Sequence, residues 1–259
     1  MSSVPIDATH GVIVPSYNSG LLLRPTVESL LRAWRPLIVV IDGSTDGSDR
    51  SLEGMEEDLH VLRLERNGGK GTAVLAALEI ASKLGWTHAA VVDADGQHAV
   101  EDLERFMGVS KRRPDAMVLG VPVFGPDAPW ERVWGRKIAN GWTQVETLWG
   151  GIQDSLFGFR VYPVGAALRI LKSISGGRAF DFDTQLVVRL YWEGVVPINL
   201  PTAVRYRVGA GGGRGVSHFR YVRDNLLLLR AHLQLALGAI RLLPHLLRLR
   251  RRTGWRGES

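Results

Sequence analysis

Short apolar runs separated by helical stretches dominate the first half of the chain. Five runs are rich in Val, Ile and Leu, and they read GVIV, PLIVVI, HVLRL, HAAVV and AMVLGV. Runs that are apolar at nearly every position are typical of strands covered on both faces, and helices between such strands favour right-handed crossovers. The pattern predicts an α/β fold with a doubly wound, mostly parallel central sheet flanked by helices.

The C-terminal segment, residues 217–259, has a different pattern. Its polar side chains fall on one narrow stripe of a helix, and Leu-rich positions cover the rest of the surface. The stripe consists of Arg223, Arg230, Gln234, Arg241, His245 and Arg248. A spanning helix needs about 20 apolar residues, and the longest stretch without Arg or Asp in this segment runs only from 231 to 240. An amphipathic helix that lies on a membrane surface is therefore expected. Packing on the rest of the protein, or on a second copy in a homodimer, is the alternative.

Charge and composition narrow the partners and the site chemistry. The net charge of +6 resides in one segment, because eight Arg and one Asp lie between residues 220 and 252, leaving 24 basic and 25 acidic residues elsewhere. This distribution argues against nucleic acid as a binding partner. It favours binding of anionic lipid head groups by residues 220–252. The absence of Cys excludes disulfides and thiolate sites, so any metal is held by oxygen or imidazole. The first ten residues lack the pattern of a secretory signal, which predicts a cytoplasmic protein, peripheral on the inner face of the cell membrane.

Polar motifs follow three of the predicted strands. PSYN, with Pro15, Tyr17 and Asn18, follows the first strand; DGSTDGS begins at Asp42 after the second; and DADGQH follows the fourth. Ligands of doubly wound sheets bind beyond the carboxyl ends of the strands, so these motifs are expected to converge. PSYN and DGSTDGS, taken singly, also fit turn and helix-cap chemistry.

The stretch NGGKGT contains glycines before a predicted helix. It lacks the spacing of a P-loop, and Val74 stands where a dinucleotide fingerprint needs its third Gly. A helix N-terminus with Lys70 and Gly71 remains, and this combination favours a bound anion.

The stretch VVDADGQH places two carboxylates two residues apart. In an extended backbone Asp93 and Asp95 face one side and Ala94 the other. Two close carboxylates persist when one is protonated or when a cation lies between them. Gln97 continues the alternation with an amide oxygen, and such oxygen ligands suit Mg²⁺ or Mn²⁺. The alternative is a solvated acidic loop.

The motif order PSYN, IDGSTDGS, NGGKG, DADGQH, DSLFGFR and FDFDTQ resembles the inverting family 2 glycosyltransferases, which have the Rossmann-like GT-A fold. The dolichyl-phosphate or polyprenyl-phosphate mannose and glucose synthases are the most similar members. The resemblance covers about residues 10 to 225. We expect a catalytic domain over residues 1–216, followed by the basic, membrane-associating helix and tail over 217–259 that the amphipathic pattern predicts.

The resemblance also implies roles for individual residues. Asp42, Pro15 and Tyr17 would hold the base and ribose of a nucleotide-diphosphate sugar, and Asn18, Lys70, Gly71 and Ala94 complete the donor-binding set. Asp93, Asp95 and Gln97 would hold the divalent ion on the diphosphate. Arg136 in GRKIANG would contact phosphate, and Arg160 in DSLFGFR would serve the acceptor side. A solvated Arg136 and a buried, ion-paired Arg160 are the alternatives.

The acceptor determines what further chemistry is needed. A polyprenyl phosphate is already anionic and attacks without a strong base, whereas a hydroxyl acceptor needs a carboxylate such as Asp154 to take its proton. Asp183 is a second acceptor-side candidate, and its alternative role is a helix cap before Thr184. Most of the four tryptophans between residues 126 and 162 are expected to pack against the sheet, with one or two left for sugar or lipid; they are Trp130, Trp134, Trp142 and Trp149.

Two departures and one glycine-rich stretch leave alternatives open. Ser19 replaces the acidic residue of the family's PxYNE pattern, and Pro122 stands where the polyprenyl-phosphate synthases usually carry Arg. The stretch VGAGGGRGV, residues 208–216, is either a linker or a lid that brings Arg214 or His218 near the phosphates. A non-catalytic module that binds nucleotide-sugar at the membrane is the alternative function, and retention of both DADGQH carboxylates favours the enzyme.

Overall fold

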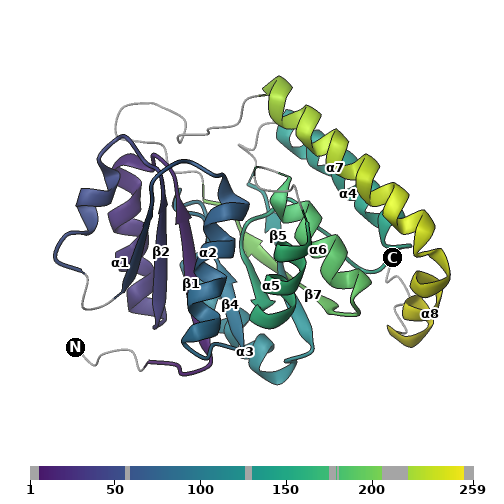
Figure 1. The fold of residues 1–259 in the computed structure, drawn as a ribbon, viewed down its shortest axis with the longest axis horizontal. Coiled ribbons are helices and arrows are strands. Elements are labelled where there is room, and N and C mark those ends of the chain that lie inside the picture. The colour runs from purple at the N-terminus through teal and green to yellow at the C-terminus, as the bar shows by residue number, and fades with distance from the viewer. Residues whose placement is uncertain are drawn as a thin grey trace.

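The computed structural model describes residues 6–55, 59–125, 130–174, 179, 181–205 and 221–253. Its centre is a seven-stranded sheet with the order β3-β2-β1-β4-β6-β5-β7 (Figure 1). The strands are β1 (His10–Ser16), β2 (Leu37–Asp42), β3 (His60–Leu64), β4 (His88–Val91), β5 (Ala116–Val123), β6 (Arg160–Pro163) and β7 (Val196–Ala203). All five strands predicted from apolar runs are confirmed as β1 to β5.

The sheet is mostly parallel, with one reversed strand. β1 pairs in parallel with β2 and β4, and β3 and β7 join in parallel at the two edges. β6 runs antiparallel to both β4 and β5. The apolar pattern does not predict β6 or β7, because β6 is four residues long and begins with a charged residue, and β7 contains two prolines. An edge strand tolerates proline since part of its backbone needs no ladder partner.

Helices cover both faces of the sheet (Figure 1). Their bounds are α1 (Leu23–Ala33), α2 (Lys70–Lys83), α3 (Leu103–Arg112), α4 (Trp130–Glu146), α5 (Val164–Ser173), α6 (Phe182–Trp192), α7 (Tyr221–Arg241) and α8 (Leu243–Thr253), with single 3₁₀ turns η1 (Gly20–Leu22), η2 (Ser48–Leu52) and η3 (Val100–Asp102). One core layer lies between the sheet and helices α1 and α3, and the other between the sheet and α2, α5 and α6. In α1, Leu23, Val27, Leu30 and Leu31 are buried, which is the helical spacing that creates an apolar stripe.

The C-terminal segment forms two helices and not the one expected. α7 and α8 meet at a bend of 79°. Pro244 lies in the first turn of α8, where its missing N–H is harmless, but it cannot donate the hydrogen bond that would continue α7. Within the described residues no single helix is long and apolar enough to cross a membrane; only the bent pair α7 and α8 passes that test by length and composition.

α7 lies along α4 on the outside of the domain (Figure 1). It buries Ala231, His232, Leu235 and Ala239 and leaves Leu226, Leu229, Leu233, Leu237 and Ile240 exposed. One face of the helix therefore packs on the protein, and the opposite face remains apolar and uncovered. The expected domain boundary at residue 216, the glycine-rich stretch, Arg214 and His218 lie outside the described residues.

Candidate functional site

The loops after β1 and β2 are joined by hydrogen bonds. The backbone N–H of Asn18 donates to Ser44 Oγ at 3.0 Å, and Asn18 Oδ1 accepts from the Thr45 N–H at 2.8 Å. Asp46 Oδ2 accepts from the Gly20 N–H at 2.9 Å. Asn18 has a φ of 47°, a left-handed conformation that Asn tolerates better than most residues. The structure thus brings PSYN and DGSTDGS together at the carboxyl edge of the sheet.

The Asp42 side chain positions the NGGKG loop. Its two carboxylate oxygens accept from the N–H groups of Gly68 and Gly69, each at 2.8 Å. Asp42 is buried, and burial raises the pKa of its carboxyl group while the two amides oppose that shift. The neighbouring Gly43 has a φ of 63°, and a Cβ there would meet the Asn67 backbone nitrogen at 2.4 Å. Asp42 therefore determines where α2 begins.

Lys70, the first residue of α2, bridges two carboxylates. Its Nζ lies 2.7 Å from Asp93 Oδ1 and 2.8 Å from Asp183 Oδ2. Burial alone would lower the pKa of Lys70, but Asp183 and Asp93 outweigh burial and raise it. Burial likewise would raise the pKa of Asp93, but Lys70 and His98 hold it well below its usual range. The ammonium and the Asp93 carboxylate are therefore charged.

The DADGQH motif is a turn and not the extended segment expected. β4 ends at Val91, and the chain then turns through Ala94 and Asp95 to Gly96, which has a φ of 70°. Ala94 is buried while the two aspartates are half-buried. Asp95 accepts from the Gln97 N–H at 3.0 Å, and burial together with the charge of Asp93 raises the pKa of Asp95. Both solutions for close carboxylates are present, since Lys70 neutralises one and the other binds its proton more tightly.

The described residues contain no cluster of three His, Asp or Glu side chains arranged for a metal. Proteins usually hold Mg²⁺ through one or two carboxylates plus substrate phosphates, so such a cluster is not required. Asp93 and Asp183 already converge on a positive charge, that of Lys70. Oxygen donors of this kind fit a cation. The predicted ligands were Asp93, Asp95 and Gln97, and the structure adds Asp183 as the second carboxylate that converges with Asp93.

Asp154 is the centre of a second polar cluster. Its Oδ1 accepts from Arg136 Nη1 at 2.7 Å and from the N–H groups of Leu156 and Phe157 at 2.9 and 2.7 Å. Its Oδ2 accepts from Asn140 Nδ2 at 3.2 Å. The side chain is 3% exposed, and that of Arg136 is 22% exposed. Arg136 is thus an ion-pair partner at the surface of this cluster and not a solvated helix residue.

Arg160 contacts Asp183 from the interior of the protein. The guanidinium is fully buried, and its Nη1 donates to the Asp183 backbone oxygen at 3.0 Å and to the Tyr162 hydroxyl at 3.1 Å. The same nitrogen lies 3.6 Å from Asp183 Oδ1. Burial would lower the pKa of Arg160, but Tyr162 and Asp183 raise it. Arg160 therefore occupies the buried ion-pair position and supports Asp183 from below.

Asp183 does not cap its helix. The N-cap of α6 is Asp181, and the Asp183 carboxylate faces Lys70 from the first turn. Thr184 Oγ1 donates to the Ser155 backbone oxygen at 3.2 Å, which places the start of α6 beside the Asp154 loop. The two polar clusters are therefore neighbours.

Gly158 is a site residue that the sequence analysis missed. A Cβ at this position would lie 2.0 Å from Asp93 Oδ2 and 2.7 Å from Lys70 Nζ. The glycine of the GFR motif thus leaves the space that the ion pair fills. His98 was also missed: its Nε2 lies 3.4 Å from Asp93 Oδ2, and its ring meets the Phe157 ring edge-on. Two motifs in the sequence pointed toward this region, since Gly158 belongs to DSLFGFR and His98 to DADGQH, but neither motif showed these contacts.

The remaining predicted residues lie at the same edge of the sheet or on α4. Pro15 is near the end of β1, Tyr17 follows it half-buried, and Gly71 is buried in the first turn of α2. Trp134, Trp142 and Trp149 are 59%, 40% and 54% exposed, so the expectation that most tryptophans pack against the sheet is wrong for these three. The side chain of Trp130 lies outside the described residues.

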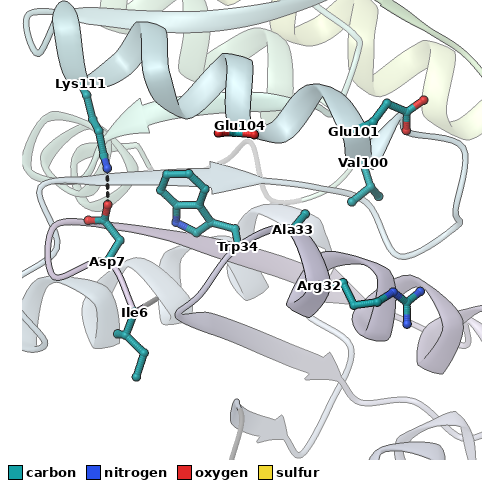
Figure 2. A pocket seen from close by; sticks show the side chains of 9 residues that line it. All are labelled: Ile6, Asp7, Arg32, Ala33, Trp34, Val100, Glu101, Glu104 and Lys111. Carbon is teal, nitrogen blue, oxygen red and sulfur yellow. Dashed lines mark ion pairs between the residues drawn. The ribbon is translucent and has the colours of Figure 1, made fainter. Parts of the chain in front are cut away.

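A groove of about 700 Å³ lies elsewhere, between the N-terminal segment, the end of α1 and α3 (Figure 2). The ring of Trp34 faces it, and an ion pair between Asp7 and Lys111 closes one end (Figure 2). None of the residues predicted for the site lines this groove.

Comparison with known proteins gives consistent results. The chain matches the family model described as Glycosyl transferase family 2 over residues 11–167, more than half of its length. Polyprenol monophosphomannose synthase of Mycolicibacterium smegmatis is 28% identical over 199 residues, 73% of this chain and 75% of the relative. UDP-N-acetylglucosamine–dolichyl-phosphate N-acetylglucosaminyltransferase of Methanococcus voltae is 27% identical over 196 residues, 68% of this chain and 78% of the relative.

A solved structure supports the fold. Glucosyl-3-phosphoglycerate synthase from Mycobacterium tuberculosis, crystallised with Mn²⁺, UDP and glucosyl-3-phosphoglycerate, has a TM-score of 0.61 at 15% identity and covers 90% of this chain and 80% of its own. At this identity the likeness shows the fold alone, and it confirms the predicted GT-A architecture.

Proposed function

Because the chain belongs to glycosyl transferase family 2, we propose that this glycosyltransferase moves a sugar from a nucleotide-diphosphate sugar to a polyprenyl phosphate or a related lipid-linked acceptor. The observation that carries the proposal is the Lys70, Asp93 and Asp183 cluster, which lies where the nucleotide-side loops meet. The names of the two relatives, both polyprenyl- or dolichyl-phosphate sugar transferases, support the acceptor class.

The donor would lie along the carboxyl edge of the sheet. Pro15, Tyr17 and Asn18 would contact the base and ribose, together with the loop that Asp42 supports. Both Asp42 carboxylate oxygens already accept hydrogen bonds from backbone N–H groups. Asp42 would therefore contribute to nucleotide binding mainly by fixing the shape of this loop. Gly71 and Ala94 are buried beside Lys70 and Asp93 and keep these charged groups in place.

A divalent ion, Mg²⁺ or Mn²⁺, would be held by Asp93 and Asp183 with Asp95 and Gln97 nearby, and when bound it would neutralise the departing diphosphate. Lys70 would then supply a second positive charge from the N-terminus of α2, which itself favours anions. Arg160 supports Asp183 from the protein interior and acts as a positioning residue. A single displacement of this kind inverts the configuration at the anomeric carbon.

The hydrogen bonding and burial of Asp154 favour a phosphate acceptor over a hydroxyl acceptor. Its carboxylate accepts four hydrogen bonds and is 3% exposed, so it is poorly placed to take a proton from a hydroxyl. A polyprenyl phosphate needs no base, because its oxygen is already anionic. Arg136, which Asp154 holds in place and which is partly exposed, would bind that phosphate.

The acceptor class implies action at a membrane surface, and two helices support this. On α4, Trp134, Ile138, Trp142 and Val145 are exposed and fall on one stripe at helical spacing, and Trp149, beyond the end of the helix, is exposed too. The exposed apolar residues of α7 form a second stripe, and the ring of Trp142 stacks on His232 of the buried face of α7, so the two helices that carry the stripes are packed together. Isolated exposed apolar residues are ordinary, but contiguous patches of this kind mark interaction surfaces.

Charge complementarity selects an anionic bilayer as the partner of this surface. Between Leu226 and Thr253 the chain has six Arg and no acidic residue. Each basic residue near an anionic surface contributes about 1 kcal/mol of attraction. The proposed location is accordingly the inner face of the cell membrane, with the protein peripheral to it.

The proposal is tested by transfer assays with purified protein. Nucleotide-diphosphate sugars are offered with a short polyprenyl phosphate, and the polyprenyl alcohol is the matched acceptor control. We expect transfer to the phosphate only, lost on adding EDTA and lost in Asp93→Asn. Transfer to the alcohol would instead support the hydroxyl-acceptor alternative, and donor binding without any transfer would support a non-catalytic module.

A further inference from the structure

Lys70 lies where two carboxylates converge, and one of them, Asp93, is a predicted ligand of the divalent ion. Its ammonium lies within 2.8 Å of carboxylate oxygens from two different elements, the β4 turn and the start of α6. We propose that Lys70 is a tethered cation that competes with the divalent ion for Asp93 and Asp183, so that the ion binds only as Lys70 is released.

The surroundings make some cation necessary at this point. The Lys70, Asp93 and Asp183 side chains are 20%, 31% and 10% exposed, so water screens the two carboxylates poorly. Two uncompensated carboxylates in such a place repel each other, and burial penalises each of them. The ammonium removes that penalty while no donor is bound.

The backbone around Lys70 fixes where its side chain starts. Asp42 holds the amides of Gly68 and Gly69, and Lys70 follows directly as the first residue of α2. On the other side, Gly158 leaves no side chain in the space that Asp93 and Lys70 share. The carboxylates and the Lys70 backbone are therefore held in place. The flexible four-carbon side chain of lysine still allows its ammonium group to move.

The competition has a measurable consequence for metal binding. In the absence of nucleotide, a divalent ion must displace the ammonium, so its affinity for the native protein is low. Removing the ammonium leaves two carboxylates that attract the ion directly. Lys70 would therefore set the requirement that the ion arrives with the diphosphate, whose negative charge offers the released ammonium a new partner.

The inference rests on the proposed function for the identity of the ion, but its test uses Mn²⁺ alone, without donor or acceptor. Mn²⁺ binding is measured by calorimetry and by the electron paramagnetic resonance signal of free Mn²⁺. Lys70→Met should bind Mn²⁺ at least about tenfold more tightly than the native protein. Lys83→Met, which removes an exposed lysine from the other end of α2, is the control with the same change in charge.

The double variant Lys70→Met with Asp93→Asn should lose the gain, which assigns the ion to these carboxylates. Equal Mn²⁺ affinity in Lys70→Met and the native protein overturns the inference, whether or not the enzyme transfers sugar. Lys70→Gln, whose amide can still donate to a carboxylate, replaces Lys70→Met if the latter does not fold.

A second measurement uses the native protein. Acetylation of Lys70 relative to Lys83, followed by mass spectrometry, should be slow without metal and rise several-fold at high Mn²⁺, with KCl of equal ionic strength as the control. A ratio that Mn²⁺ leaves unchanged would contradict the competition.

Discussion

Glu146 Oε1 lies 2.8 Å from His232 Nδ1, and this buried contact joins the end of α4 to the middle of α7. Both side chains are almost fully enclosed, at 0% and 6% exposure. The Glu146 backbone oxygen also accepts from Trp192 Nε1 at 3.0 Å, so α6 is tied to the same point. Burial raises the pKa of Glu146, and the bond to His232 opposes that shift. The apolar surface of α4 and α7 depends on this contact for its shape.

Removing one partner of this contact should destabilise the protein. His232→Leu leaves the Glu146 carboxyl group buried without its partner, and we expect the free energy of unfolding to fall by about 3 kcal/mol. The measurement is urea denaturation followed by circular dichroism. The double variant Glu146→Met with His232→Leu should recover most of the loss, because two apolar side chains need no partner. A double variant as unstable as the single one would show that packing, and not the polar contact, is at stake.

Adding one methyl group at Gly158 should disable the site. The new Cβ of Gly158→Ala would overlap Asp93 and press on Lys70, so the ion pair must shift. We expect kcat/KM to fall by about 100-fold, since misplacement of about 1 Å at a reacting centre has effects of this size. Gly165→Ala, whose Cβ would meet only the end of the Arg169 side chain at 3.8 Å, is the control. Full activity in Gly158→Ala would show that catalysis does not depend on the geometry of the Lys70–Asp93 ion pair.

Asp154 should matter more for stability than for proton transfer. Asp154→Ala leaves Arg136, Asn140 and two backbone N–H groups without their acceptor, and we expect a loss of about 3 kcal/mol in the free energy of unfolding. Asp154→Asn keeps an acceptor oxygen and should retain transfer to a polyprenyl phosphate within about tenfold. If Asp154→Asn folds but its activity falls about 1,000-fold and its pH–rate profile loses the acidic limb, Asp154 is a general base.

A buried histidine pair should make stability fall in mild acid. The rings of His10 and His88 stack at 4.7 Å, and burial, followed by repulsion from His88, lowers the pKa of His10 to about 4. Burial also lowers the pKa of His88. The unfolded chain binds these protons near pH 6.5, so the stabilisation is complete above pH 6.5 and is lost as the pH falls toward 4.

We expect the His10 contribution to fall by about 2 kcal/mol between pH 7 and pH 5, measured as the difference between the native protein and His10→Gln in urea denaturation at each pH. Carboxyl groups with a raised pKa, such as Asp42, act in the opposite direction in both proteins and cancel in this difference. His10→Gln should show a flatter profile over this window. The carboxylates with lowered pKa, such as Asp93, lose their contribution only below about pH 4, where unfolded carboxyl groups begin to bind protons. Identical profiles for the variant and the native protein would exclude His10 as the cause.

Polar substitutions on α4 should weaken membrane binding. Trp134→Ser with Ile138→Ser removes two exposed apolar side chains from the α4 stripe, and we expect binding to vesicles that contain anionic lipid to fall about tenfold in a flotation assay. Leu21→Ser with Leu84→Ser removes two exposed apolar residues from the 3₁₀ turn η1 and from the C-terminal end of α2, and this pair serves as the control. An equal loss of vesicle binding in both double variants would indicate a general effect of exposed apolar surface. If the native protein is a dimer and only the α4 double variant is a monomer, the partner of this surface is a second copy of the chain.

Much of the fold and part of the site could be predicted from local patterns. The five apolar runs identified β1 to β5, and turn-forming motifs directly after them identified the loops that meet at one edge. β6 could not be found this way, because four residues beginning with Arg160 show no apolar run and its pairing depends on β4 and β5. The Trp stripe of α4 was also misjudged, since helical periodicity shows that one face is apolar but not whether another element covers it.

The sequence by itself determined the layered α/β architecture, the family and the acidic turn after β4, because strand burial and turn chemistry are written in neighbouring residues. Only the tertiary structure decided which cation the acidic turn meets. Lys70 and Asp183 are 113 positions apart, and the N-termini of α2 and α6 must both lie beside the turn after β4 before Lys70 can meet Asp93 and Asp183. Contacts between such distant positions arise from how the elements pack, and no spacing along the chain records them.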